Sequence, residues 1–185
     1  MLRINRTFVR EYARAYDRQR RTSRKGRREE SEERALKGWL RGQASIKHLD
    51  KGHFVRLATW KNARRSESYE RNSSPLVRET TRLASRTLND RLKVHVLMAL
   101  EGVNVTVAAA ILHFFNPRLF PIFDIRDRTT LKKAGLWKRR PSDASIEAWE
   151  EYVPIMRRLS RRFRVSLRDL DKALFAYDRW GRIRR

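Results

Sequence analysis

The chain has 185 residues and a hydrophobic fraction of 40%, enough for one domain of ordinary size with an appended segment. The absence of cysteine excludes disulfides, thiolate zinc sites and ordinary iron–sulfur clusters, and no apolar run is long enough for a membrane span. A formal net charge of +24 predicts a polyanionic partner, with nucleic-acid phosphate as the first candidate. An acidic membrane surface or another acidic partner is the alternative.

The N-terminal residues 1–34 differ from the rest of the chain. Phe8, Tyr12 and Tyr16 recur every four residues and predict a helix with one apolar stripe. The stretch from Arg18 to Arg28 is rich in arginine and lysine and contains no acid, and the acidic segment EESEER follows it. We therefore expect residues 1–34 to form a basic helix and a mobile arm, which either seeks phosphate or serves as a solvated linker.

Residues 35–185 carry apolar residues mostly at helical spacing, so we expect one helical domain. Ser74 is a predicted N-cap with Pro75 at the first helical position, and Ser166 is a predicted N-cap further on. Pro154 predicts either a kinked helix or a junction of two shorter ones. The one β-like run is LFPIFDI, which prolines bracket. The predicted fold class is all-α, a compact bundle of about seven or eight short helices.

A turn between two helical patterns is the most informative local feature. The patterns at Leu88–Leu100 and Val105–Phe115 are joined by the sequence EGVN. Gly102 can adopt positive φ without steric cost, and Asn104 is the next most tolerant residue for a left-handed position. Val103, between them, is expected to point into the core.

The start of the second helix predicts an anion site. Its first backbone N–H groups, on Val105, Thr106 and Val107, have no partner within the helix and lie at the positive end of the helix dipole. We expect this hairpin to hold a DNA phosphate through its backbone. Such a contact carries no sequence information. A plain helix–helix turn is the alternative.

The segment LMALEGVNVTVAAAIL resembles the helix-hairpin-helix motif, whose pattern is roughly L-x-G-V-G-x-x-x-A-x-x-I. Asn104 stands where the motif has its second glycine. Downstream, LFPIFDIRDR is similar to the P-V-D-x-H segment of the helix-hairpin-helix DNA glycosylases, the superfamily of endonuclease III. The resemblance covers residues 88–131 and is greatest to uncharacterised bacterial members. It implies a glycosylase-like helical domain that binds DNA.

On this resemblance, Asp124 matches the catalytic aspartate, which stabilises the cationic sugar and orients the attacking water. Thr106 occupies the position of the lysine in the bifunctional members, so the resemblance implies a monofunctional glycosylase without the lyase step. Arg126 stands where the family has a histidine. Without the resemblance, Asp124 is a helix N-cap or a partner of Arg126 or Arg128. These two arginines are themselves either phosphate contacts or partners of nearby aspartates.

Trp60 and Lys61 are a further candidate pair, because a tryptophan beside basic residues can stack on an unpaired base. The alternative for Trp60 is a place in the core. The histidines are scattered and form no pattern of metal ligands, so we expect neither metal nor cofactor.

The leading hypothesis is a DNA-binding protein of the helix-hairpin-helix type that grips the phosphate backbone of double-stranded DNA without reading its sequence. One alternative is a monofunctional DNA N-glycosylase of base excision repair that uses Asp124. A second is an RNA- or ribosome-associated basic protein. The expected location is the cytoplasm, in association with the nucleoid. The predicted phosphate contacts are Gly102, Val103, Asn104, Val105, Thr106, Arg126 and Arg128.

Overall fold

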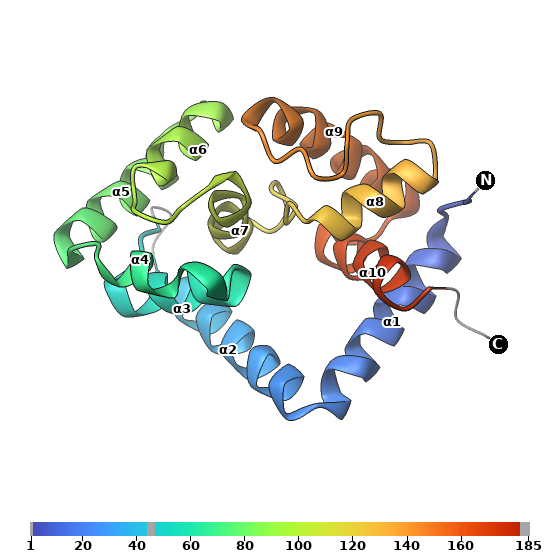
Figure 1. The fold of residues 1–185 in the computed structure, drawn as a ribbon, viewed down its shortest axis with the longest axis horizontal. Helices are drawn as coiled ribbons and strands as arrows, with labels where there is room; N and C mark the ends of the chain where they lie inside the picture. The colour runs from blue at the N-terminus through green and yellow to red at the C-terminus, as the bar shows by residue number, and fades with distance from the viewer. Residues whose placement is uncertain (1, 44–46, 182–185) are drawn as a thin grey trace. The chain divides into compact units, whose positions relative to one another are not determined.

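The computed structural model describes residues 2–43 and 47–181, and within them the chain is helical with no strand (Figure 1). This confirms the all-α prediction, although the ten α-helices exceed the seven or eight expected for the same residues. The β-like run LFPIFDI forms no strand and leads into helix α8. The helices are α1 (Arg6–Thr22), α2 (Arg24–Arg41), α3 (Lys51–Lys61), α4 (Ser66–Glu70), α5 (Ser74–Arg86), α6 (Asp90–Met98), α7 (Val105–Phe115), α8 (Ile125–Lys133), α9 (Ile146–Phe163) and α10 (Leu167–Trp180), with the 3₁₀ turn η1 (Ala63–Arg65).

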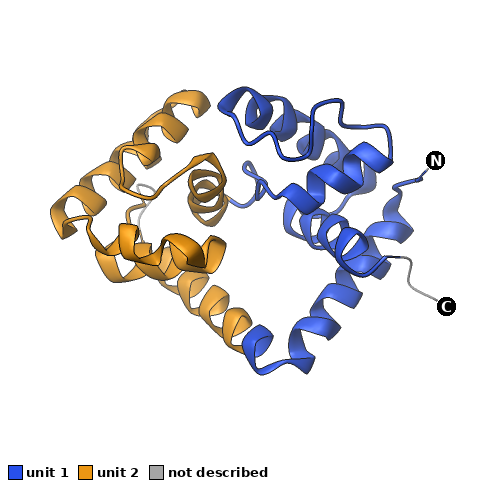
Figure 2. Ribbon diagram, in the orientation of Figure 1, with its two compact units in different colours: residues 1–27, 117–185 blue, residues 28–116 orange. Residues whose placement is uncertain are grey.

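The chain forms two compact units (Figure 2). Unit 1 combines residues 1–27 with residues 117–185, and unit 2 comprises residues 28–116. The division therefore differs from the predicted boundary after residue 34. Unit 1 is discontinuous in sequence because the N-terminal helix belongs with the C-terminal helices.

Aromatic side chains fasten α1 to α10 within unit 1. The ring centroids of Phe8 and Tyr177 lie 5.5 Å apart, and those of Tyr12 and Tyr177 lie 5.3 Å apart. Tyr16 packs edge-on against Phe175 of α10. The predicted apolar stripe on the first helix thus faces the core of unit 1, and the polar side of α1 faces solvent.

The predicted mobile arm at Arg18–Arg28 is instead helical apart from Ser23, where α1 gives way to α2. The Ser23 hydroxyl accepts a hydrogen bond from the Gly26 N–H at 3.0 Å, which starts the second helix. Pairs at i,i+4 then join the acidic segment to basic residues along α2. These pairs are Arg28–Glu32, Glu30–Arg34 and Glu33–Lys37. The acidic segment therefore supports a helix.

Helix α7 is the core element of unit 2. All of its residues except Thr106 are buried, and it packs against α3 and α6. Small side chains at Ala108, Ala109 and Ala110 contribute to this burial. The apolar run that predicted the helix is therefore the element around which unit 2 is built.

Several predicted helix ends are corrected or resolved by the structure. The N-cap of α5 is Ser73, one residue before the predicted Ser74, because the Ser73 hydroxyl accepts the Leu76 N–H. Helix α9 continues through Pro154 as one helix. Ser166 caps α10 as predicted.

Candidate nucleic-acid interface

The turn between α6 and α7 requires glycine for two reasons. Gly102 has a φ of 84°, which side chains of L-residues rarely adopt. A Cβ atom on Gly102 would also lie 2.8 Å from both Ser68 Cβ and the Tyr69 ring. Val103 is 7% exposed, so its predicted inward orientation is confirmed. Backbone conformation and close packing together fix the turn.

A buried asparagine clasps the turn from a distant part of the chain. The Asn72 side chain accepts the Glu101 N–H at 2.8 Å and donates to the Glu101 carbonyl at 3.1 Å. Arg71 Nε donates to the Glu101 carboxylate at 2.7 Å. This ion pair lowers the pKa of the exposed Glu101. The contacts of Asn72 and Arg71 with the turn were not predicted from the sequence.

Asn104 plays a different part from the one predicted. Its φ of −110° is extended rather than left-handed, and it is the N-cap of α7. Its side-chain oxygen accepts the Val107 N–H at 3.1 Å and the Thr106 hydroxyl at 2.8 Å. The Val107 N–H is therefore engaged, contrary to expectation. Within residues 2–43 and 47–181, no acceptor is found for the N–H groups of Gly102, Asn104, Val105 and Thr106.

Asp124 lies in unit 1, whereas the turn at Gly102 lies in unit 2. Its carboxylate caps α8 by accepting the Arg126 N–H at 3.0 Å. Its carbonyl accepts the Arg128 N–H at 3.2 Å. Of the roles predicted for Asp124, the N-cap is the one that these contacts describe. Its catalytic role stays a prediction.

The two arginines after Asp124 both contact other residues of unit 1, but only Arg128 is buried. Arg126 forms an ion pair with Asp178 at 3.2 Å and lies over the Phe175 ring. Arg128 is 2% exposed, lies 4.0 Å from the Phe123 ring centroid and donates to the Asp143 carbonyl. Burial lowers the pKa of Arg128. The predicted phosphate contact by Arg128 is therefore corrected, because its guanidinium is enclosed by the fold.

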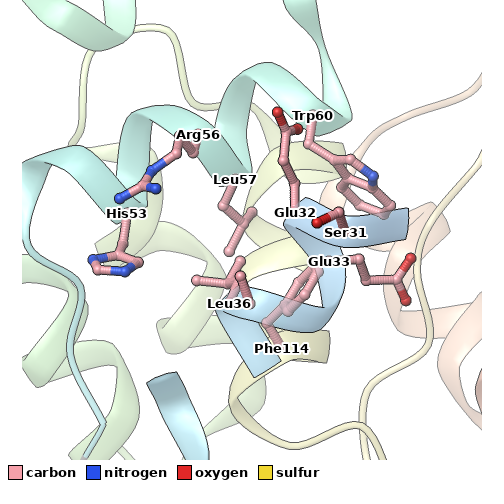
Figure 3. Close-up of a pocket in the computed structure, with 10 residues that line it drawn as sticks. Ser31, Glu32, Glu33, Leu36, His53, Arg56, Leu57, Trp60 and Phe114 are labelled. Carbon is pink, nitrogen blue, oxygen red and sulfur yellow. The ribbon is translucent and has the colours of Figure 1, made fainter. Parts of the chain in front are cut away.

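Trp60 lines a small pocket in unit 2 together with residues of α2, α3 and α7 (Figure 3). The pocket has a volume of about 140 Å³, and Leu36, Leu57 and Phe114 form its apolar part. Trp60 meets Phe114 edge-on at 5.5 Å. Glu32, Glu33, His53 and Arg56 also line the pocket, so its lining contains both acidic and basic residues. Base stacking by Trp60 and Lys61 stays a prediction.

The outer side of α1 carries a feature that sequence analysis did not single out. Four arginines recur every fourth residue, and each is exposed. With a rise of about 1.5 Å per residue, consecutive members are about 6 Å apart along the axis. No ion pair joins any of them to a carboxylate within residues 2–43 and 47–181. The α1 stripe consists of Arg6, Arg10, Arg14 and Arg18.

A metal-binding cluster and a membrane-spanning helix are both absent from the described residues. No group of three or more histidine, aspartate or glutamate side chains there is placed to hold a metal ion. No helix in the same residues is both long and apolar enough to cross a membrane. Comparisons with protein-family models, with curated proteins and with solved structures found no match for this chain.

Proposed function

We propose that this protein binds the phosphate backbone of double-stranded DNA without reading its sequence. The α1 stripe carries the proposal. It presents four exposed guanidinium groups in a row, and the fold provides no carboxylate to neutralise them within the described residues. Arginine is suited to phosphate because its planar group donates two parallel hydrogen bonds. A row of such groups matches a linear polyanion.

The turn between α6 and α7 offers a second kind of contact. The N–H groups of Asn104, Val105 and Thr106 have no acceptor among the described residues, and they lie at the N-terminus of an eleven-residue helix. Such donors favour an anion. The resemblance of this segment to the helix-hairpin-helix motif supports the same use. Contacts of both kinds reach phosphate rather than base edges, so the binding is independent of sequence.

Base removal has less support than binding. A glycosylase requires the Asp124 carboxylate to act on a sugar, yet one of its oxygens is engaged in capping α8. RNA offers the same backbone charge as DNA, and it is the competing ligand that an experiment must include.

The experiment measures affinity for a labelled DNA duplex of mixed sequence as salt concentration rises. Each phosphate contact contributes about 0.9 to the slope of log K against log salt. Replacing Arg10, Arg14 and Arg18 by glutamine is therefore expected to reduce the slope by about 2.7. The matched control replaces Arg78, Arg82 and Arg86, which have the same spacing on α5. An equal loss of slope in both variants would contradict a specific role for the α1 stripe.

The choice of nucleic acid is tested in the same assay. Duplexes of two unrelated sequences are expected to bind with equal affinity, since the contacts are made to phosphate. A large preference for one sequence would refute backbone binding as the main mode. Tighter binding to duplex RNA than to DNA would assign the stripe to RNA.

A further inference from the structure

Helix α5 presents a second row of arginines, this time beside leucines. Its inner side is buried at Val77, Thr81 and Ala84. Its outer side forms a shallow hollow of about 480 Å³, lined by arginines together with Pro75, Glu79 and Leu83. The α5 face consists of Pro75, Leu76, Arg78, Glu79, Arg82, Leu83 and Arg86.

The three arginines of the α5 face form no ion pair among the described residues. Arg78, Arg82 and Arg86 are exposed and recur every fourth residue along the helix. No ion pair joins them to a carboxylate within the described residues, and Glu79 is the only acid of α5 itself. The face thus keeps a net positive charge that a partner of opposite charge can complement.

The leucines distinguish this face from an ordinary basic surface. Leu76 is 44% exposed and Leu83 is 51% exposed, on the edge of α5 beside the arginine row. Of nine exposed large hydrophobic side chains in the described residues, five lie between residues 76 and 98. Single exposed leucines are common, but two of them beside a row of arginines give this face both charge and apolar surface. These five are Leu76, Leu83, Leu88, Leu92 and Met98.

We infer that the α5 face binds a helical segment of another protein that carries acidic residues along one edge and apolar residues along the next. The four-residue spacing of the arginines gives steps of about 6 Å, which is the spacing of carboxylates at i and i+4 on a partner helix. The leucines lie beside this row, so an apolar edge of the same partner helix covers them. Charge sets the orientation, and burial of leucine supplies affinity.

Other occupants fit the α5 face less well. A nucleic-acid backbone pairs with the arginines but leaves Leu76 and Leu83 in water. A membrane surface requires a continuous apolar face, whereas three arginines and Glu79 border Leu83 in this hollow. A second copy of this chain carries the same net charge of +24, and its acidic segment is already engaged in pairs along α2.

The test uses the intact protein and a labelled synthetic peptide of about five helical turns. The peptide carries glutamates every fourth residue along one edge and leucines along the next. A scrambled peptide of identical composition is the control, because it has the same charge without the two edges. At about 150 mM salt we expect the amphipathic peptide to bind about tenfold more tightly than the scrambled one.

Variants separate the contribution of the leucines from that of charge. Replacing Leu76 and Leu83 by serine should abolish the tenfold preference for the amphipathic peptide. The affinity for the scrambled peptide should stay unchanged. Replacing Arg78, Arg82 and Arg86 by glutamine should lower the affinity for the amphipathic peptide about tenfold or more. The same change at Arg10, Arg14 and Arg18 of α1 should lower that affinity less than about threefold. Helical content by circular dichroism checks that each variant is folded.

Four outcomes would overturn the inference. The first is equal affinity for the two peptides, and the second is an unchanged preference in the leucine variant. The third is loss of DNA or anionic-vesicle binding in the leucine variant, which would assign the face to that ligand. The fourth is self-association of the wild-type protein that the leucine variant lacks, which would assign the face to a second copy. DNA binding through α1 is measured separately, so either proposal can fail alone.

Discussion

Helices α1 and α5 present arginines at the same spacing, but the side chains beside the two rows differ. On α1 the exposed neighbours of the stripe are polar, such as Thr7 and Glu11, and on α5 they are Leu76 and Leu83. We propose an anionic partner for both rows, since neither has a carboxylate partner among the described residues. The neighbours decide which partner, because phosphate leaves leucine in water and an apolar helix edge buries it. The arginines determine that the partner is negatively charged, and the adjacent side chains determine which kind of molecule it is.

The largest expected effect comes from removing each arginine row in turn. Replacing Arg10, Arg14 and Arg18 by glutamine should lower DNA affinity on the order of a hundredfold at low salt, because three charge-assisted contacts are lost. The same change at three α5 positions should lower it only severalfold through long-range attraction. Fluorescence anisotropy with one labelled duplex measures both. Equal losses would mean that the two rows bind DNA alike, and the comparison would collapse.

The next effect concerns the turn at Gly102, for which we propose a phosphate contact through the backbone rather than through side chains. Gly102→Ala should lower the free energy of unfolding by at least about 2 kcal/mol, because the new Cβ needs space that Tyr69 occupies and φ is positive. Urea denaturation measures the loss. Gly38→Ala is the control: its Cβ meets nothing within 4 Å and it lies inside α2, so this change should stabilise slightly.

The same variant shows whether the turn or the α1 stripe dominates DNA binding. At a temperature where Gly102→Ala remains folded, we expect its DNA affinity to fall severalfold at most, since the arginines of α1 are unchanged. A loss as large as that from the arginine variant would make the turn the main contact. The α1 stripe would then be secondary.

A smaller effect is expected from making α1 resemble α5. Thr7 and Glu11 are exposed on α1 beside Arg6 and Arg10. Replacing both by leucine places an apolar edge beside an arginine row. This variant should bind the amphipathic acidic peptide up to about tenfold more tightly than wild type, with little change for the scrambled peptide. Thr7→Ser with Glu11→Gln is the control that changes these positions without adding apolar surface. An equal gain in the control would show that charge alone recruits the peptide.

Local determinants explain what the sequence could predict. The bounds of α7 were predicted correctly, because its apolar run and the residues of the preceding turn are adjacent in the chain. The positive φ of Gly102 was anticipated for the same reason. The predicted left-handed Asn104 was wrong, because an asparagine before a helix can also cap it, and the cap engages two donors at once.

Contacts between distant residues explain what was missed. Asn72 clasps Glu101 from 29 residues away, and no local pattern marks it. Arg128 looked like a surface residue beside other charges, but the Phe123 ring and the Asp143 carbonyl enclose it. The α1 stripe, by contrast, is visible as a four-residue period in the sequence. That its arginines are exposed could not be predicted without knowing that the opposite side of α1 packs on α10.

The smallest expected effect concerns the acid sensitivity of unit 1, to which both α1 and Asp143 belong. Hydrogen bonds from the Ser145 hydroxyl and N–H, with the Arg139 guanidinium, lower the pKa of Asp143 to about 2. A carboxyl whose pKa is lower in the folded state stabilises that state above its unfolded pKa of about 3.9. This stabilisation is lost as pH falls from about 4 towards 2. Between about pH 5 and about pH 2, the urea midpoint of Asp143→Asn should therefore change less than that of wild type. Glu79→Gln, at an exposed carboxylate, is the control. A pH profile unchanged in Asp143→Asn would show that this cluster contributes nothing to the acid sensitivity of unit 1.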